Sequence, residues 1–415
     1  MTVCFTDDAA LAGGSVASAA PRDAALDTGR QAMANPLPRT LYIEHPLLWP
    51  TGYTAWLPER VPTIRRVGYT LVDLMRRGLI SPRAVEDFQR ETLLADVTWR
   101  VLWADTAPRS EAQSVVDALR NARGVVVFIH GWAGSGEIWE DLPSMVVQRN
   151  PRLVALVPDV NGFGGTPFST PNPPFDKCDP PANMRAIELW LDILGIRARS
   201  RQTKLRPVIF VGHSMGGATL FFLDEKFWRK GEVGRIALAP ALLLNDRQRQ
   251  LFYRTVGTGI RLTGVSDLLD QLVGKVIAPR FIEAVAGSGS PQVRAQHKRI
   301  FDSTPQGVIA QTFAAMGTLQ ASFSESKWPD FITFLAERDL LVGQKPTSDL
   351  LASLHFHPDQ IKLVSGDHYF FSVDGRADQE HVQNRNHVVA HILAMHLMMH
   401  DRLNPRPEAK TRSLR

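Results

Sequence analysis

The sequence predicts an α/β fold in which a doubly wound, mostly parallel sheet carries an inserted helical cap. Short, continuous apolar runs alternate along the chain with stretches of helical periodicity. Strands of this kind are buried on both faces, as in a parallel sheet that helices cover from both sides. One interval, residues 241–327, is too long for a simple crossover and contains helical patterns at residues 265–276 and 306–319. We therefore assign residues 241–327 to the helical cap.

The N-terminal part of the chain precedes this pattern. Residues 1–38 are rich in Ala, Gly, Ser and Asp, and we expect them to form a disordered tail. Residues 39–96 form an N-terminal arm, in which apolar side chains at helical spacing predict an amphipathic helix over residues 64–78. Ser81-Pro82 predicts the start of a second, short helix, because proline suits the first helical turn.

The α/β core is assigned to residues 97–240 and 328–415. Its strands are expected at the apolar runs, which are residues 98–103, 124–131, 153–159, 207–211, 235–240, 331–335 and 361–364. The run at residues 98–103 is expected to begin the sheet. Helical patterns occupy the intervals between runs, for example residues 183–196.

A G-x-S-x-G fragment occupies residues 212–216, between an expected strand and a helical pattern. A strand that turns sharply into a helix crowds its own backbone, and Gly212 and Gly216 relieve this crowding. Such a turn holds its serine in a strained conformation with the hydroxyl group exposed. Ser214 is therefore the candidate nucleophile.

A serine hydroxyl is a weak nucleophile until a base takes its proton, and a buried carboxylate then orients that base. Asp339 and His368 each follow an expected strand downstream of Ser214. This order is the one expected when all three residues lie at the carboxyl edge of a doubly wound sheet. Glu337 competes with Asp339, but Asp339 falls in the turn beyond the strand. The predicted catalytic residues are Ser214, Asp339 and His368.

Several further motifs accompany these residues: His130-Gly131-Trp132, Pro158-Asp159 with Gly162-Phe163-Gly164, and Gly366-Asp367-His368. With them, residues 97–403 resemble the α/β-hydrolase family, in particular its capped, serine-nucleophile, esterase- and lipase-like members. The resemblance implies an oxyanion hole that two backbone N–H groups form. One belongs to Met215, which follows the nucleophile, and the other to Trp132, which follows the third strand of the family.

These residues predict a serine hydrolase that cleaves a carboxylic ester of a small apolar substrate through an acyl-enzyme intermediate, without a cofactor or a metal. We expect Trp132, Phe163, Phe168 and Phe252 near the pocket. A C–C bond hydrolase, a perhydrolase or an acyltransferase would use the same triad. A non-catalytic small-molecule receptor of the same fold is a further alternative.

Composition excludes other classes. The net charge of +5 comes from 47 basic and 42 acidic residues among 415, without the basic patch of a nucleic-acid-binding protein. No run reaches the about 18 apolar residues of a membrane span. The N-terminus lacks the basic region of a signal peptide, so we expect a cytoplasmic protein with no integral membrane segment. The oligomeric state stays open. The histidine pairs 387/391 and 396/400 lie on opposite helix faces, so they predict no metal site.

Overall fold

The computed structural model describes residues 62–105, 115–196, 205–243 except 225 and 227, 247–263, 283, 287, 289–318, 330–373 and 379–405. The tail expected at residues 1–38, the first part of the arm and the helix expected at residues 265–276 lie outside these ranges. No helix within the described ranges is long and apolar enough to span a membrane.

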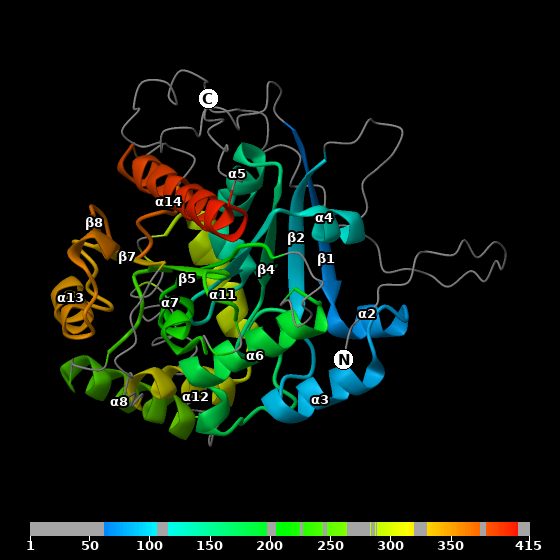
Figure 1. Ribbon diagram of the computed structural model, residues 1–415. Coiled ribbons are helices and arrows are strands. Elements are labelled where there is room, and N and C mark those ends of the chain that lie inside the picture. The colour runs from blue at the N-terminus through cyan, green and yellow to red at the C-terminus, as the bar shows by residue number, and fades with distance from the viewer. Residues whose placement is uncertain are drawn as a thin grey trace, which may run out of the picture.

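One mostly parallel sheet forms the centre of the molecule (Figure 1). Its strands are β1 (Thr63–Thr70), β2 (Thr98–Asp105), β3 (Gly124–Ile129), β4 (Leu153–Pro158), β5 (Val208–His213), β6 (Val233–Leu238), β7 (Phe331–Ala336) and β8 (Ile361–Val364). They lie in the order β1-β2-β4-β3-β5-β6-β7-β8. The pairs β1–β2 and β2–β4 are antiparallel, and every later pair is parallel. The predicted fold class is confirmed, and so are all seven predicted strands.

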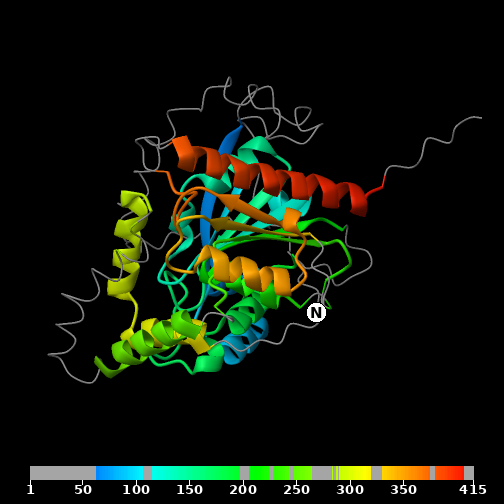
Figure 2. The same ribbon diagram turned by 90° about the vertical axis from the view of Figure 1, so that its left-hand side faces the viewer.

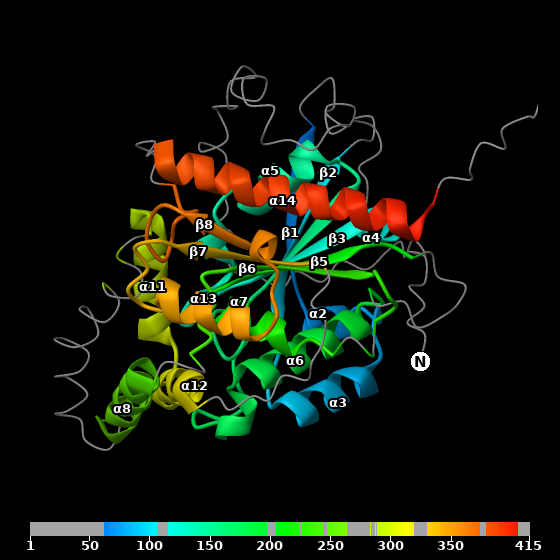
Figure 3. The same ribbon diagram turned by 60° about the vertical axis from the view of Figure 1, so that its left-hand side comes forward.

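Helices cover both faces of the sheet, as doubly wound sheets require. The α-helices are α2 (Leu71–Arg76), α3 (Pro82–Thr92), α4 (Val115–Asn121), α5 (Leu142–Arg149), α6 (Pro180–Ile193), α7 (Met215–Thr219), α8 (Arg247–Thr263), α11 (Pro291–Ser303), α12 (Gln306–Thr318), α13 (Gln344–Ser353) and α14 (Gln379–Leu403). Short 3₁₀ helices are η4 (Gly136–Trp139), η5 (Phe175–Lys177), η6 (Leu220–Phe222) and η9 (Pro358–Gln360). Figure 3 shows α5 and α14 on one face, with α3, α6, α7 and α13 on the other.

The predicted helix over residues 64–78 is wrong in its first half. Residues 63–70 form β1, an edge strand whose eight residues all pair with β2. Its side chains are mostly exposed, so its apolar residues show no strand alternation that the sequence could reveal. The helix starts only at Leu71, because the Thr70 side chain accepts a hydrogen bond from the Asp73 N–H at 3.1 Å and caps α2. The sheet therefore begins inside the arm, one strand before the run at residues 98–103.

The second helix of the arm, α3, also packs against the α/β core. α3 starts at Pro82, as predicted, and buries Val85, Phe88 and Thr92. α3 packs against α6, so this helix of the arm covers the same face of the sheet as α6.

Three described helices, α8, α11 and α12, lie between β6 and β7 in the chain. α8 and α12 pack against each other, where Tyr253 stacks on Phe313 with ring centroids 4.3 Å apart. α11 is separate from this pair and contacts η4, which follows β3. In Figure 2, α11 stands beside the sheet and α8 and α12 lie below it.

We expect Phe210→Ala to lower the free energy of unfolding by about 3–5 kcal/mol. Phe210 lies in the central strand β5, is fully buried and meets Trp228 edge to face. Phe175→Ala is the matched control, because 40% of Phe175 is exposed. Its cost should stay within about 1 kcal/mol. Urea titration compares the two variants, and equal shifts would contradict the burial of Phe210.

Candidate active site

Ser214 occupies a tight turn between β5 and α7. Its φ of 53° and ψ of −116° lie outside the regions that a residue with a side chain normally adopts. The turn is fixed by its backbone, since the Ser214 N–H donates to the Leu238 carbonyl at 2.9 Å. Ser214 is 7% exposed. A strained serine that the surrounding backbone holds in place is typical of a functional position.

The glycines on either side of Ser214 make this turn possible. A Cβ atom on Gly212 would overlap the carbonyl oxygen of Gly216, and one on Gly216 would overlap the carbonyl oxygen of Ile129. Both obstacles are backbone atoms, which cannot rotate away. The turn is therefore packed directly against the end of β3.

His368 and Asp339 meet at the ends of β8 and β7. The Nδ1 atom of His368 lies 2.8 Å from Oδ2 of Asp339, and both residues are 4% exposed. The other carboxylate oxygen of Asp339 accepts the N–H groups of Leu341 at 2.9 Å and Val342 at 3.1 Å. Burial works to raise the pKa of Asp339, but His368 and these N–H donors outweigh it, so the pKa is lowered. Asp339 is thus held as a carboxylate against the ring of His368.

The other carboxylates in these two loops face elsewhere. Glu337 is exposed at the end of β7. Asp367 lies 3.6 Å from Arg338 in an ion pair on the surface. The structure therefore brings Asp339 to His368, and neither of its neighbours.

The Ser214 turn and the loop that carries His368 are in contact through His213. The Nε2–H of His213 donates to the backbone carbonyl of His368 at 3.0 Å, and the two rings are 4.6 Å apart. Burial lowers the pKa of His213 well below its usual value, so this ring is neutral. The Nε2 atom of His368 is buried and has no hydrogen-bond partner among the described residues, Ser214 included. A hydrogen bond between a catalytic base and its nucleophile is often long or poorly aligned in a structure without substrate.

A second loop follows β3 and lies against Ser214; we call residues 130–135 the β3 loop. A Cβ atom on Gly131 would lie 3.0 Å from Cβ of Ser214. His130 fixes the loop, because its Nδ1–H donates to the Gly131 carbonyl at 2.7 Å and its Nε2 accepts the Val160 N–H at 2.9 Å. Burial lowers the pKa of His130, which keeps it in this neutral form. His130 and His213 thus serve as hydrogen-bonding residues of the framework.

The proposed oxyanion residues lie at these two loops. Met215 follows Ser214 and is fully buried, and its sulfur accepts the Asn161 amide at 3.3 Å. Trp132 lies in the β3 loop, and its indole N–H donates to the Thr312 hydroxyl of α12 at 3.0 Å. α12 is thereby attached to the β3 loop.

Aromatic side chains gather around Trp132. Phe163 and Phe313 are buried, with ring centroids 6.1 and 4.8 Å from that of Trp132. Phe168 is 9% exposed and bridges to Leu94 of the arm. Phe252 is 48% exposed and contacts Phe313 edge to face, with ring centroids 6.4 Å apart, so its place near the pocket stays a prediction. Its neighbour Tyr253 is buried and stacks on Phe313.

Sequence reasoning missed the residues that support these loops. Asp159 was noted only as part of a motif, yet its carboxylate accepts the N–H groups of Gly136 and Gly165 at 2.7 and 2.8 Å. Tyr369 and His297 form a buried hydrogen-bonded pair next to His368. Nothing in their sequence surroundings distinguishes them from ordinary core residues. Among the residues described, no group of three or more His, Cys, Asp or Glu side chains is arranged to hold a metal ion.

Comparison with known proteins is consistent with this geometry. The family model described as "Alpha/beta hydrolase family" matches residues 126–405, which is more than half of the chain. The chain belongs to the alpha/beta hydrolase family. No curated protein matches it.

Solved structures of low identity are similar to this chain. A thermophilic esterase from Thermogutta terrifontis is 14% identical, with a TM-score of 0.47, and the match covers 72% of this chain and 94% of that one. A putative aryl esterase from Burkholderia cenocepacia is 18% identical, with a TM-score of 0.46, over 73% and 96% of the two chains. The peroxisomal alpha-beta-hydrolase Lpx1 from Saccharomyces cerevisiae is 13% identical, with a TM-score of 0.46, over 84% and 91%. Every TM-score is below 0.5, so these likenesses add nothing to what the family model shows.

We expect Gly216→Ala to destabilise the protein by about 1–3 kcal/mol, because the new methyl group meets rigid backbone at Ile129 and His130. Gly259→Ala is the matched control, since nothing lies within 4 Å of its Cβ position on α8. That change should stabilise the protein by about 0.5–1 kcal/mol, because alanine favours a helix. Thermal unfolding measures both variants. Equal and small effects would contradict the close packing of the turn.

Proposed function

We propose that this hydrolase cleaves a carboxylic ester through an acyl-enzyme intermediate, with Ser214 as nucleophile, His368 as general base and Asp339 as the acid that orients it. The buried 2.8 Å contact between His368 and Asp339 carries this proposal. It leaves Nε2 of His368 as the only ring nitrogen that could exchange a proton with Ser214.

In the first half of the reaction, Oγ of Ser214 attacks the ester carbonyl carbon as its proton passes to Nε2 of His368. The carbonyl oxygen becomes an oxyanion, which the N–H groups of Met215 and Trp132 would stabilise. The C–O bond to the alcohol then breaks, and His368 returns the proton to the leaving alcohol. The carboxylate of Asp339 stabilises the imidazolium between these two transfers.

In the second half, water attacks the acyl-serine carbon and gives a proton to His368. The second oxyanion collapses, the bond to Oγ breaks, and His368 protonates Ser214. The products are a carboxylic acid and the regenerated enzyme. No atom changes its oxidation state, so the reaction needs no redox cofactor.

The aromatic surroundings support an apolar substrate. Trp132, Phe163 and Phe313 pack together beside the β3 loop, and Thr312 occupies the indole N–H of Trp132. An apolar wall with few free polar groups selects apolar acyl or alcohol groups. We propose that α8, α11 and α12 belong to a cap over this site, within residues 241–327.

Hydrolysis of p-nitrophenyl esters of increasing chain length tests the reaction. We expect the wild-type protein to hydrolyse short or medium esters and to be labelled at Ser214 by a fluorophosphonate probe. Ser214→Ala should lose labelling, and its kcat should fall by a factor on the order of 10⁶. Equal turnover in both proteins would refute the mechanism. An unlabelled wild type would favour a non-catalytic receptor, and labelling without ester hydrolysis would favour an acyltransferase or a C–C bond hydrolase.

The role of Asp339 is tested separately. Asp339→Asn should lower kcat by about 10³- to 10⁴-fold, because an amide can hold His368 in the wrong tautomer. Glu337→Gln removes the same charge two residues away on an exposed side chain, so its kcat should stay within about twofold of wild type. Steady-state kinetics at neutral pH provide the comparison. A larger effect at Glu337 would assign the acid to that residue.

A further inference from the structure

Helix α12 is buried on every side. All residues from 308 to 317 are buried, as in a helix that belongs to a hydrophobic core. Its first turn packs on the loop that follows β4, where a Cβ atom on Gly162 would lie 2.7 Å from Cγ1 of Val308. Further along the helix, Phe313 contacts both Tyr253 of α8 and Trp132 of the β3 loop. α12 therefore joins α8 to the loops at the carboxyl edge of the sheet.

A hydrogen bond connects α12 to the β3 loop. The Nε1–H of Trp132 donates to the hydroxyl of Thr312 at 3.0 Å. This hydroxyl donates its own proton within α12, where the carbonyl oxygens of Val308 and Ile309 lie at 2.7 and 3.2 Å. Thr312 is fully buried, and Trp132 is 4% exposed. Because the hydroxyl proton is committed to the helix, a lone pair of the same oxygen faces the indole.

Three apolar rings surround the indole. Phe163, Phe301 and Phe313 come from the loop after β4, from α11 and from α12, and their centroids lie 6.1, 6.1 and 4.8 Å from that of Trp132. None of these three side chains carries an oxygen or a nitrogen that could accept the indole proton. A buried indole N–H normally has a partner, and the loss of that partner is unfavourable. The phenylalanines thus define the space for the ring, and the Thr312 hydroxyl defines its orientation.

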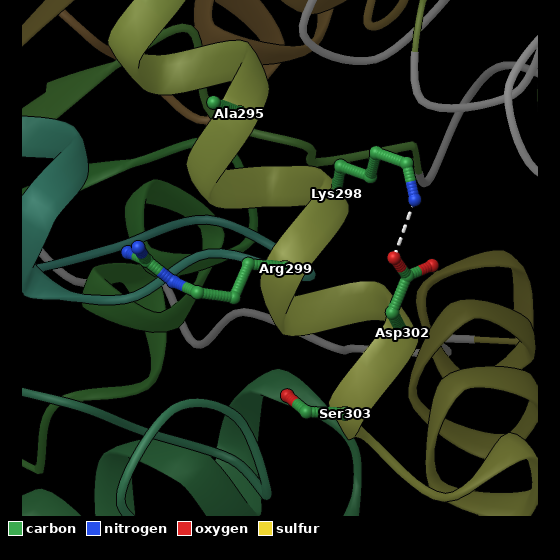
Figure 4. A pocket seen from close by; sticks show the side chains of 5 residues that line it. All are labelled: Ala295, Lys298, Arg299, Asp302 and Ser303. Atoms are coloured by element: carbon green, nitrogen blue, oxygen red, sulfur yellow. Dashed lines mark hydrogen bonds and ion pairs between the residues drawn. The ribbon is translucent and has the colours of Figure 1, made fainter.

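The outer side of α11 is an ordinary surface. A shallow hollow on that side is lined by Ala295, Lys298, Arg299, Asp302 and Ser303 (Figure 4). Lys298 and Asp302 are exposed and pair along the helix. The hollow is lined by no residue of the catalytic loops. α11 meets Trp132 through the apolar ring of Phe301, whereas α12 provides a hydrogen bond.

The conformation of the β3 loop makes this attachment important. Ala133 has a φ of 52°, a left-handed conformation that is unfavourable for alanine. The turn around Trp132 closes with a long bond of 3.3 Å from the Gly134 N–H to the Gly131 carbonyl. An oxyanion donor acts only when its N–H is fixed at the position where negative charge develops. Since the indole and the backbone N–H of Trp132 belong to one residue, holding the indole restrains the turn that carries the N–H.

We propose that Thr312 is a positioning residue through which the cap completes the oxyanion hole: it holds the indole of Trp132 and thereby directs the Trp132 backbone N–H at the oxyanion. This inference rests on the proposed ester hydrolysis and deepens it. Loss of the Thr312 hydroxyl should weaken binding of the transition state more than binding of the ester, because full negative charge reaches the oxygen only in the transition state. The docked position of α12 is thus a condition for rapid catalysis.

Thr312→Val tests the proposal, because valine keeps the shape of threonine and removes the hydroxyl. We expect kcat for a p-nitrophenyl ester to fall about 10- to 100-fold, with KM within about threefold, because a displaced donor costs less than a missing one. Thr304→Val is the matched control: the Thr304 hydroxyl, at the end of α11, donates to the Ile300 carbonyl at 2.7 Å, and the residue is 9% exposed. This control should stay within about twofold in both constants. Thr312→Ser, which keeps the hydroxyl, should recover most of kcat.

A double-mutant cycle tests whether Thr312 acts through the indole. Trp132→Phe removes the indole N–H and keeps an aromatic ring, and we expect it to lower kcat at least about tenfold. In that background Thr312→Val should change kcat by less than about twofold, because its partner is already gone. An arylboronic acid, which forms a tetrahedral adduct with a serine hydroxyl, measures the oxyanion hole directly. Its inhibition constant should rise at least about tenfold in Thr312→Val and stay unchanged in Thr304→Val.

Each of five results would overturn the proposal: equal kcat for Thr312→Val and Thr304→Val, a rise in KM with kcat unchanged, no recovery in Thr312→Ser, additive effects in the cycle, or unchanged inhibition by the boronic acid. If Thr312→Val does not fold, Trp132→Phe replaces it, and an unchanged kcat in that variant would equally refute the proposal.

Fluorophosphonate labelling of the wild type separates the two levels of inference. A wild type that is neither labelled nor active refutes the ester mechanism. A labelled, active wild type with an unaffected Thr312→Val variant refutes only the role of Thr312.

Discussion

The contact of backbone with backbone at Gly216 governs the arrangement of the site. β3 and β5 are neighbours at the centre of the sheet, and the turn after β5 packs on the carbonyl groups of Ile129 and His130 at the end of β3. No side chain fits between them. Ser214 is therefore brought against Gly131, and the two segments proposed to supply oxyanion donors become adjacent without any flexible group between them. Strain at Ser214 is the consequence of this packing, and the sheet holds it in place.

A second constraint fixes the loop of His368 to the segment that follows β3. Glu140, itself at a φ of 50°, accepts the Ser372 hydroxyl at 3.1 Å and the Val373 N–H at 3.0 Å. Arg385 of α14 pairs with Glu140 and donates to the Phe371 carbonyl at 2.9 Å. This ion pair is largely buried, so its value lies in holding a defined geometry more than in net stability. It ties the chain after β3 to the chain after β8 across the long C-terminal helix.

The strands and the positions of Ser214, Asp339 and His368 at strand ends could be predicted because they depend on local patterns. Apolar runs mark strands that are buried on both faces, and a parallel sheet places their carboxyl ends at one edge. β1 could not be predicted, because an exposed edge strand needs no apolar alternation and its stability comes from pairing with β2. The exposure of Phe252 and the burial of His297 depend on how helices dock, which no spacing in the sequence records.

A carboxylate distinguishes His368 from the other buried histidines of the neighbouring segments. His213 lies 4.6 Å from it, ring centroid to ring centroid, and His130 and His297 are buried in the β3 loop and in α11. Burial lowers the pKa of all three, so they stay neutral. Of these four rings, His368 alone has a carboxylate at Nδ1. A positive charge on a buried ring is costly unless an opposite charge lies against it. The contact with Asp339 thus supports the proposal that His368 is the base, while the neutral rings of His130 and His213 hold the loops in place through hydrogen bonds.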